Sequence, residues 1–121
     1  MSTLGSRLEG PRVCLEAARE GEYRIVRSAD GVELGTLRMV DEDGALCVRE
    51  LCIDEAHRGY GAGSGAAALV RKAWAADGRW QVLRAFAPQG AGLAVYYWMR
   101  MGLRPVPGEG PEGGLLLERK R

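Results

Sequence analysis

Alternating apolar and polar residues dominate the first half of the chain and predict strands. β-Branched and aromatic residues recur at every second position, and short clusters of Asp, Gly and Ser interrupt them. We expect strands over residues 12–17, 22–27, 32–40 and 45–53, with turns at 29–31 and 41–44. The amino-terminal half is therefore predicted to be a strand meander.

The second half changes to the spacing of an amphipathic helix. Residues 64–76 place apolar side chains on one helical face, at Ala66, Leu69, Val70, Ala73 and Trp74. A strand at 80–87, a helix at 92–101 that ends before Gly102, and a closing strand at 114–119 follow.

This order of elements predicts an α+β domain with a mixed sheet. A strand-helix-strand crossover is right-handed and pairs two parallel strands, whereas the meander makes the rest of the twisted sheet mostly antiparallel. The length of the chain predicts that residues 1–121 form one domain. Within it we expect a loose amino terminus at 1–10, the meander at 12–53 and the closing strand at 114–119. Lys120 and Arg121 are expected to be a solvated end.

Composition excludes several classes of partner. The net charge is +1, so nothing indicates binding to nucleic acid or to an anionic membrane surface. No apolar run has the length of a membrane span and no signal peptide begins the chain, so a cytoplasmic location is expected.

Cysteine and histidine content give no sign of a metal site. The three cysteines, Cys14, Cys47 and Cys52, are odd in number and lack C-x-x-C spacing, which favours buried reduced thiols. The single histidine, His57, lies beside Arg58 in a predicted loop, where we expect it to be solvated. We therefore predict no bound metal.

The glycine-rich segment 58–63, Arg-Gly-Tyr-Gly-Ala-Gly, lies between a predicted strand and a predicted helix. Glycines at 59, 61, 63 and 65 remove side chains that would keep a ligand away from the backbone. The N–H groups at the helix amino terminus carry partial positive charge, so phosphate or pyrophosphate is the natural ligand.

The glycine-rich segment has other possible interpretations. A glycine-rich turn without a ligand is the simplest one. A dinucleotide fingerprint fits Gly61-x-Gly63-x-x-Ala66, but polar residues intervene after the strand and the next strand, 80–87, contains no acid. A P-loop is excluded because no Gly-Lys-Ser/Thr follows.

The motif Arg58-x-x-Gly61-x-Gly63, preceded by Leu51-x-Ile53-Asp54-Glu55, resembles the acyl-CoA-binding motif of the GNAT superfamily of N-acetyltransferases. A second landmark, residues 94–103, resembles the late helix of that family, which ends in Tyr-x-x-x-Gly-Phe. The resemblance covers residues 46–106, about half of the chain. It implies a GNAT-like fold and acetyl-CoA as co-substrate, bound by a core at 58–106.

The resemblance also implies which residues contact CoA. The pantetheine arm would pair with the backbone of Cys52 and Ile53 as an additional strand. The pyrophosphate would lie on the loop, whose expected binding residues are Arg58, Gly59, Tyr60, Gly61, Ala62, Gly63 and Ser64.

The catalytic positions of the family are only partly filled. Some members have a carboxylate base at the position that Cys47 occupies in this chain. The candidate base is instead Glu50. Strand alternation places Glu50 and Cys52 on the face opposite Leu51 and Ile53. Trp98 occupies the position of the family's tyrosine acid, and an indole cannot protonate a thiolate. A one-residue shift of the helix would make Tyr97 the candidate acid. Ala91 replaces a frequent asparagine.

The two helices that wall the acceptor site in the family are reduced or missing here. We expect this to leave apolar sheet surface uncovered, which a second copy in a homodimer would cover. The leading hypothesis is an N-acetyltransferase that transfers acetyl to a primary amine, the acceptor being an unidentified small molecule or protein. The alternatives are a non-catalytic acyl-CoA-binding module or degenerate homologue, and a domain whose glycine loop is purely structural.

Overall fold

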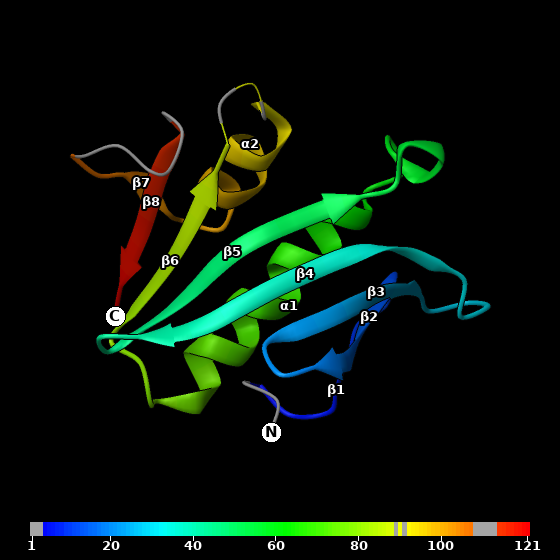
Figure 1. Ribbon diagram of the computed structural model, residues 1–121, viewed down its shortest axis with the longest axis horizontal. Helices are drawn as coiled ribbons and strands as arrows, with labels where there is room; N and C mark the ends of the chain where they lie inside the picture. Colours follow the sequence, from blue (N-terminus) through cyan, green and yellow to red (C-terminus); the bar gives the residue numbers. More distant parts are fainter. Residues whose placement is uncertain (1–3, 89, 91, 108–113) are drawn as a thin grey trace.

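The computed structural model describes residues 4–88, 90, 92–107 and 114–121, and within them a single mixed sheet. Its eight strands lie in the order β1-β2-β3-β4-β5-β6-β8-β7, and only β5 and β6 pair in parallel (Figure 1). The strands are β1 Arg7–Glu9, β2 Val13–Arg19, β3 Glu22–Arg27, β4 Glu33–Glu42, β5 Ala45–Ile53, β6 Val82–Ala87, β7 Arg104–Pro105 and β8 Leu115–Lys120. The predicted α+β class, the meander and the parallel pair are confirmed.

Two helices cover one face of the sheet. α1, Ala62–Asp77, connects β5 to β6, and α2, Gly92–Arg100, follows β6. Before α1, the described residues contain only the three-residue 3-10 helix η1, Glu55–His57. The predicted loss of the amino-terminal helices is therefore confirmed for the described part of the chain.

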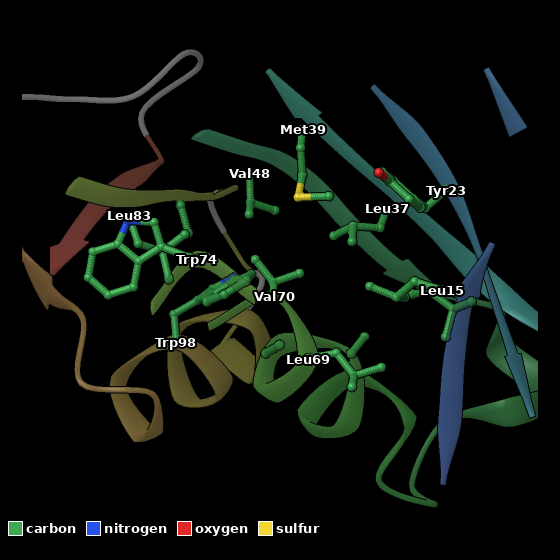
Figure 2. Close-up of a cluster of buried hydrophobic side chains, with 14 of the residues drawn as sticks. Leu15, Tyr23, Leu37, Met39, Val48, Leu69, Val70, Trp74, Leu83 and Trp98 are labelled. Carbon is green, nitrogen blue, oxygen red and sulfur yellow. The ribbon is translucent and has the colours of Figure 1, made fainter. Parts of the chain in front are cut away.

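The core lies between the helices and the sheet (Figure 2). Trp74 of α1, Trp98 of α2 and Leu83 of β6 meet at one end of it, and Leu15, Tyr23 and Leu37 fill the other end. Each of these side chains is at most 2% exposed. Burial of such large apolar side chains is the main stabilising term of the fold.

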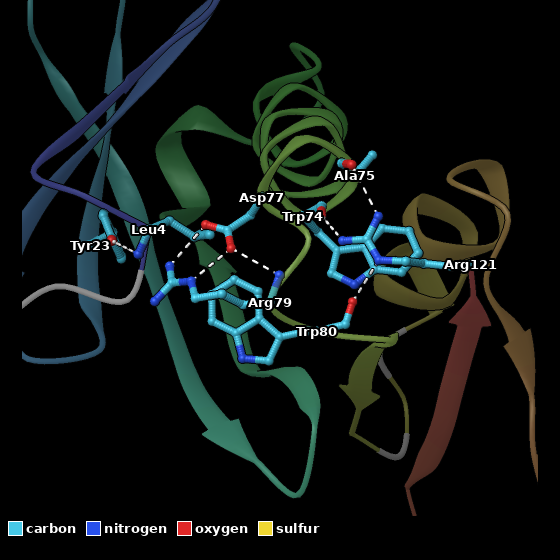
Figure 3. Close-up of polar contacts among 8 residues, drawn as sticks. All are labelled: Leu4, Tyr23, Trp74, Ala75, Asp77, Arg79, Trp80 and Arg121. Atoms are coloured by element: carbon cyan, nitrogen blue, oxygen red, sulfur yellow. Dashed lines mark hydrogen bonds and ion pairs between the residues drawn. The ribbon is translucent and has the colours of Figure 1, made fainter.

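Both chain ends are more ordered than the sequence indicated. β1 pairs with β2 within the segment expected to be loose, with Leu8 opposite Leu15. Arg121 donates from Nε to the carbonyl of Trp80 at 2.8 Å and from Nη1 to that of Ala75 at 3.0 Å (Figure 3). Lys120 and Arg121 are exposed, as predicted, but Arg121 is not a free end, because its guanidinium group satisfies carbonyl groups at the carboxyl end of α1.

The face of the sheet opposite the helices carries ion pairs. Arg84 pairs with Glu118 at 2.6 Å and with Glu42 at 3.8 Å, and Glu42 also pairs with Arg49. No large apolar side chain exposed in the described residues belongs to β2, β3, β4, β5 or β6. The expected apolar surface, on which the homodimer hypothesis rested, is therefore not found over these strands.

No helix of the described residues is both long enough and apolar enough to cross a membrane.

Close contact between β4 and β5 depends on Gly35, which pairs with Ile53. A Cβ at this position would lie 2.1 Å from the backbone oxygen of Cys52. We expect Gly35→Ala to lower the free energy of unfolding by about 3 kcal/mol, because backbone must move to admit the methyl group. Urea denaturation would measure it.

The matched control is Gly92→Ala, where a Cβ would meet no atom of the described residues within 4 Å. Its free energy of unfolding should stay within about 1 kcal/mol of the wild type. Equal losses in the two variants would show that the contact with Cys52 is not the cause.

Candidate functional site

The strands β5 and β6 separate halfway along their length. They pair from Ala45 opposite Val82 to Val48 opposite Ala85, and then diverge, whereas β5 stays paired with β4 as far as Ile53 (Figure 1). Over residues 49–53, the edge of β5 that faces β6 therefore has no strand partner among the described residues. An extended ligand could hydrogen-bond to this free backbone.

A β-bulge accompanies the separation. Arg38 of β4 pairs with Glu50 and the next residue, Met39, pairs with Val48, so Arg49 is an extra residue on β5. A bulge bends its strand and increases the local twist. The bend carries the end of β5 away from β6 and opens the sheet at this point.

A cavity of about 610 Å³ occupies the gap. Its walls come from the end of β5, from β6 and from α2, and its lining residues include Glu50, Leu51, Cys52, Ile53, Phe86, Leu93 and Tyr97. Glu50 and Cys52 are exposed while Ile53 is buried, as the alternation predicted. The expectation that the three thiols are buried is therefore wrong for Cys52, because its side chain lies on the open face of β5. The two candidate backbone partners, Cys52 and Ile53, thus lie on the cavity wall.

The glycine loop turns the chain from η1 into α1. Gly59 and Gly61 have φ angles of +89° and +84°, which favour glycine, and Gly61 is the residue before the first helical one. The first helical bond of α1 runs from Gly65 N to Gly61 O at 2.9 Å. The N–H groups of Ala62, Gly63 and Ser64 therefore have no acceptor within the helix.

A second cavity, of about 190 Å³, lies over this loop. It is lined by the loop residues Arg58, Gly59, Gly61, Ala62 and Gly63, and by Leu93, Tyr96 and Tyr97 of α2. It shares Ile53, Arg58, Leu93 and Tyr97 with the larger cavity. The free N–H groups of the helix and the gap between the strands thus belong to one continuous depression.

Arg58 joins the loop to the end of β5. Its Nε donates to the carbonyl oxygen of Ile53 at 2.9 Å, and the residue lines both cavities. Its positive charge therefore lies at the junction of the two cavities, where an anionic ligand bound to the loop would enter the gap between β5 and β6. Tyr60, the neighbour of Gly61, is 80% exposed.

Tyr97 and Trp98 have opposite environments. Trp98 is fully buried beside Trp74 (Figure 2), and its Nε1 has no hydrogen-bond partner among the described residues. Tyr97 is half-buried and lines both cavities. Successive residues of a helix are turned by about 100°, so Tyr97 faces the gap because Trp98 faces the core.

The ring of Tyr97 packs against Gly63. A Cβ on Gly63 would lie 2.3 Å from the Cε2 atom of Tyr97 and 2.9 Å from its hydroxyl oxygen. The hydroxyl group is therefore held near the first turn of α1. Gly63 thus has a second function that the motif did not reveal, which is to leave room for the aromatic ring.

Cys47 does not reach the gap. It is 2% exposed and lies on the face of the sheet without helices. Burial raises the pKa of its thiol, and this effect is larger than that of the nearby positive charge of Arg49, which lowers the pKa. This agrees with a small buried side chain rather than a nucleophile. Ala91 lies outside the described residues.

Arg12 is a residue that sequence analysis missed. Its Nη1 lies 2.7 Å from the position of a Cβ on Gly61, so its guanidinium group lies against the glycine loop. Arg12 comes from the start of the meander, far earlier in the chain, and no motif links the two segments.

Comparison with known proteins assigns the fold. No family model and no curated protein matches the sequence. Solved structures do match, among them one named as a ribosomal-protein-serine acetyltransferase from Vibrio cholerae, with a TM-score of 0.77 and 8% identity over 95% of this chain and 97% of the other. One named as a GNAT-family acetyltransferase from Bordetella pertussis has a TM-score of 0.71 and 17% identity over 93% and 98%.

The N-terminal domain of ribosomal-protein-alanine acetyltransferase from Clostridium acetobutylicum also matches, with a TM-score of 0.71 and 11% identity over 94% of this chain and 95% of the other. Each match extends over more than nine tenths of both chains, so the chain has the fold of the GNAT acetyltransferases. The fold that the resemblance implied is confirmed.

The contact between Gly63 and Tyr97 can be tested without a ligand. We expect Gly63→Ala to lower the free energy of unfolding by about 2 kcal/mol, because the methyl group overlaps the ring. In a Tyr97→Ala background the same change should cost about 1 kcal/mol less, since the overlapping ring is gone. Urea denaturation of the four proteins gives the coupling, and additive costs would show that the two residues do not act on each other.

Proposed function

We propose that the protein is a GNAT-type N-acetyltransferase that binds acetyl-CoA and transfers the acetyl group to a primary amine by direct attack on the thioester. The observation that carries the proposal is the continuity between the gap in the sheet and the glycine loop. The gap has the unpaired backbone that an amide-containing pantetheine arm needs. The loop has the free N–H groups that a pyrophosphate needs.

Binding would use backbone more than side chains. The backbone of Cys52 and Ile53 would pair with the pantetheine amides, while the N–H groups between Gly59 and Ser64 would donate to the pyrophosphate. Arg58 lines both cavities and would balance the charge of the phosphates at their junction. Tyr60 offers an exposed ring at the edge of the loop for stacking with the adenine.

In the proposed reaction, Glu50 accepts a proton from the acceptor's ammonium group, which frees the nitrogen lone pair. The nitrogen forms a bond to the thioester carbon, and the carbon–sulfur bond breaks with its electron pair on sulfur. Tyr97 then donates its hydroxyl proton to the thiolate, and the nitrogen, as it becomes an amide, returns its second proton to the tyrosinate. Glu50 and Tyr97 both line the larger cavity, from opposite walls of the gap.

The alternative is a module that binds acyl-CoA without turnover. The burial of Trp98, at the position where the family has its tyrosine, favours this alternative. The acceptor side of the sheet also lacks covering helices in the described residues. Binding and turnover are therefore tested separately.

Binding is tested by thermal unfolding with acetyl-CoA. A ligand at a hundred times its Kd adds about 2.7 kcal/mol of stability, which corresponds to about 10 °C in a domain of this size. We expect Gly61→Asp to abolish this shift, because it places a carboxylate where the pyrophosphate would lie.

Gly61→Asn is the matched control, since asparagine has the same size and tolerates the positive φ about as well as aspartate. The asparagine variant should keep most of the shift. A wild-type melting temperature that does not change with millimolar acetyl-CoA would refute both CoA-dependent functions.

Turnover is tested by release of free CoA thiol with a panel of amines. We expect Tyr97→Phe and Glu50→Gln each to lower kcat about a hundredfold, because each removes a proton-transfer group, while the thermal shift with acetyl-CoA persists. Trp98→Phe should keep kcat at temperatures where the variant is folded. Thermal shifts without thiol release from any amine would favour the binding module.

A further inference from the structure

Arg12 lies in an electrostatically unfavourable position. Its Nη1 is 2.7 Å from the Cβ position of Gly61, the residue that precedes α1, where the helix presents its positive end. A guanidinium group and a helix amino terminus repel each other. Their approach becomes favourable when an anion lies within reach of both.

The described residues provide no such anion. No carboxylate forms an ion pair with Arg12 there, in contrast to Arg27, which pairs with Asp30 at 2.9 Å. Arg58, the other arginine of the loop region, donates to the carbonyl of Ile53. Arg12 is thus a cation held beside the loop without a counter-charge in the described part of the chain.

Arg12 lines a third cavity, of about 290 Å³, on the other flank of the loop. Arg27 and His57 also line it, and Tyr60 lies at its wall. Since Arg27 pairs with Asp30, the exposed guanidinium group of Arg12 is the cation that this cavity offers to a phosphate group.

The three cavities follow one another along the protein. The gap between β5 and β6 shares Ile53, Arg58, Leu93 and Tyr97 with the cavity over the loop. That cavity in turn shares His57 and Ala62 with the cavity of Arg12. The gap and the cavity of Arg12 have no lining residue in common.

This order matches the order of groups in CoA, which runs from thioester and pantetheine through pyrophosphate to a ribose that carries a 3′-phosphate. We propose that Arg12 binds the 3′-phosphate of CoA, an assignment that rests on the proposed function. An acceptor is a poor candidate for this cavity, because the cavity does not adjoin the gap in which the thioester would lie. Arg12 thereby selects CoA over its 3′-dephosphorylated form.

The test compares CoA with dephospho-CoA, which lacks only the 3′-phosphate. Isothermal titration calorimetry gives the Kd of both ligands for the wild type and for Arg12→Ala, Arg12→Lys and Arg19→Ala. Arg19 is the matched control, because it lies exposed at the far end of β2, about 20 Å away. Melting temperatures without ligand check that each variant is folded.

We expect the wild type to bind CoA about tenfold more tightly than dephospho-CoA. Arg12→Ala should abolish that preference and leave the Kd of dephospho-CoA unchanged. Arg12→Lys should keep part of the preference, since it retains the charge without the planar fork. Arg19→Ala should behave as the wild type.

Two results would overturn the assignment while leaving the proposed function intact. Equal weakening of both ligands by Arg12→Ala would place Arg12 at the pyrophosphate, and an unchanged preference for CoA would place the 3′-phosphate elsewhere. If the wild type bound neither ligand, the proposed function itself would fail.

Discussion

The interrupted pairing between β5 and β6 is the constraint on which the rest of the site depends. Parallel pairing stops after Val48, and the extra residue Arg49 bends β5 away from its neighbour. The sheet stays intact because β5 remains paired with β4 and β6 with β8. An open edge is normally a hazard for a sheet, and here it faces the cavity that α2 and Arg58 of the glycine loop also line.

Much of the fold follows from sequence patterns. The turn at Asp43 and Gly44, with φ angles of +50° and +78°, is the tight hairpin expected within residues 41–44. The strands predicted at 22–27 and 45–53 have the predicted bounds. These local signals are strong because one face of each strand must be buried, which fixes both its alternation and its register.

The site was less predictable, because its geometry depends on contacts between distant segments. The bulge at Arg49 shifts the alternation by one residue, from 46 and 48 to 51 and 53, but two adjacent charged residues do not by themselves show that the strand continues through them. Tyr97 faces the cavity and Trp98 faces the core because of how α2 is rotated about its own axis, which its contacts with Trp74 and Gly63 determine. Arg12 reaches the loop only through the packing of β2 on α1.

The bulge has an evolutionary consequence. Residues 46, 48, 51 and 53 of β5 face the helices, and the deletion of Arg49 alone would leave that alternation regular. One codon therefore separates two forms of the sheet that bury the same core residues. In one form β5 and β6 are open at this point, and in the other they could pair to their ends. The capacity to hold an extended ligand can thus be gained or lost by one insertion or deletion, at little cost to the residues that fold the protein.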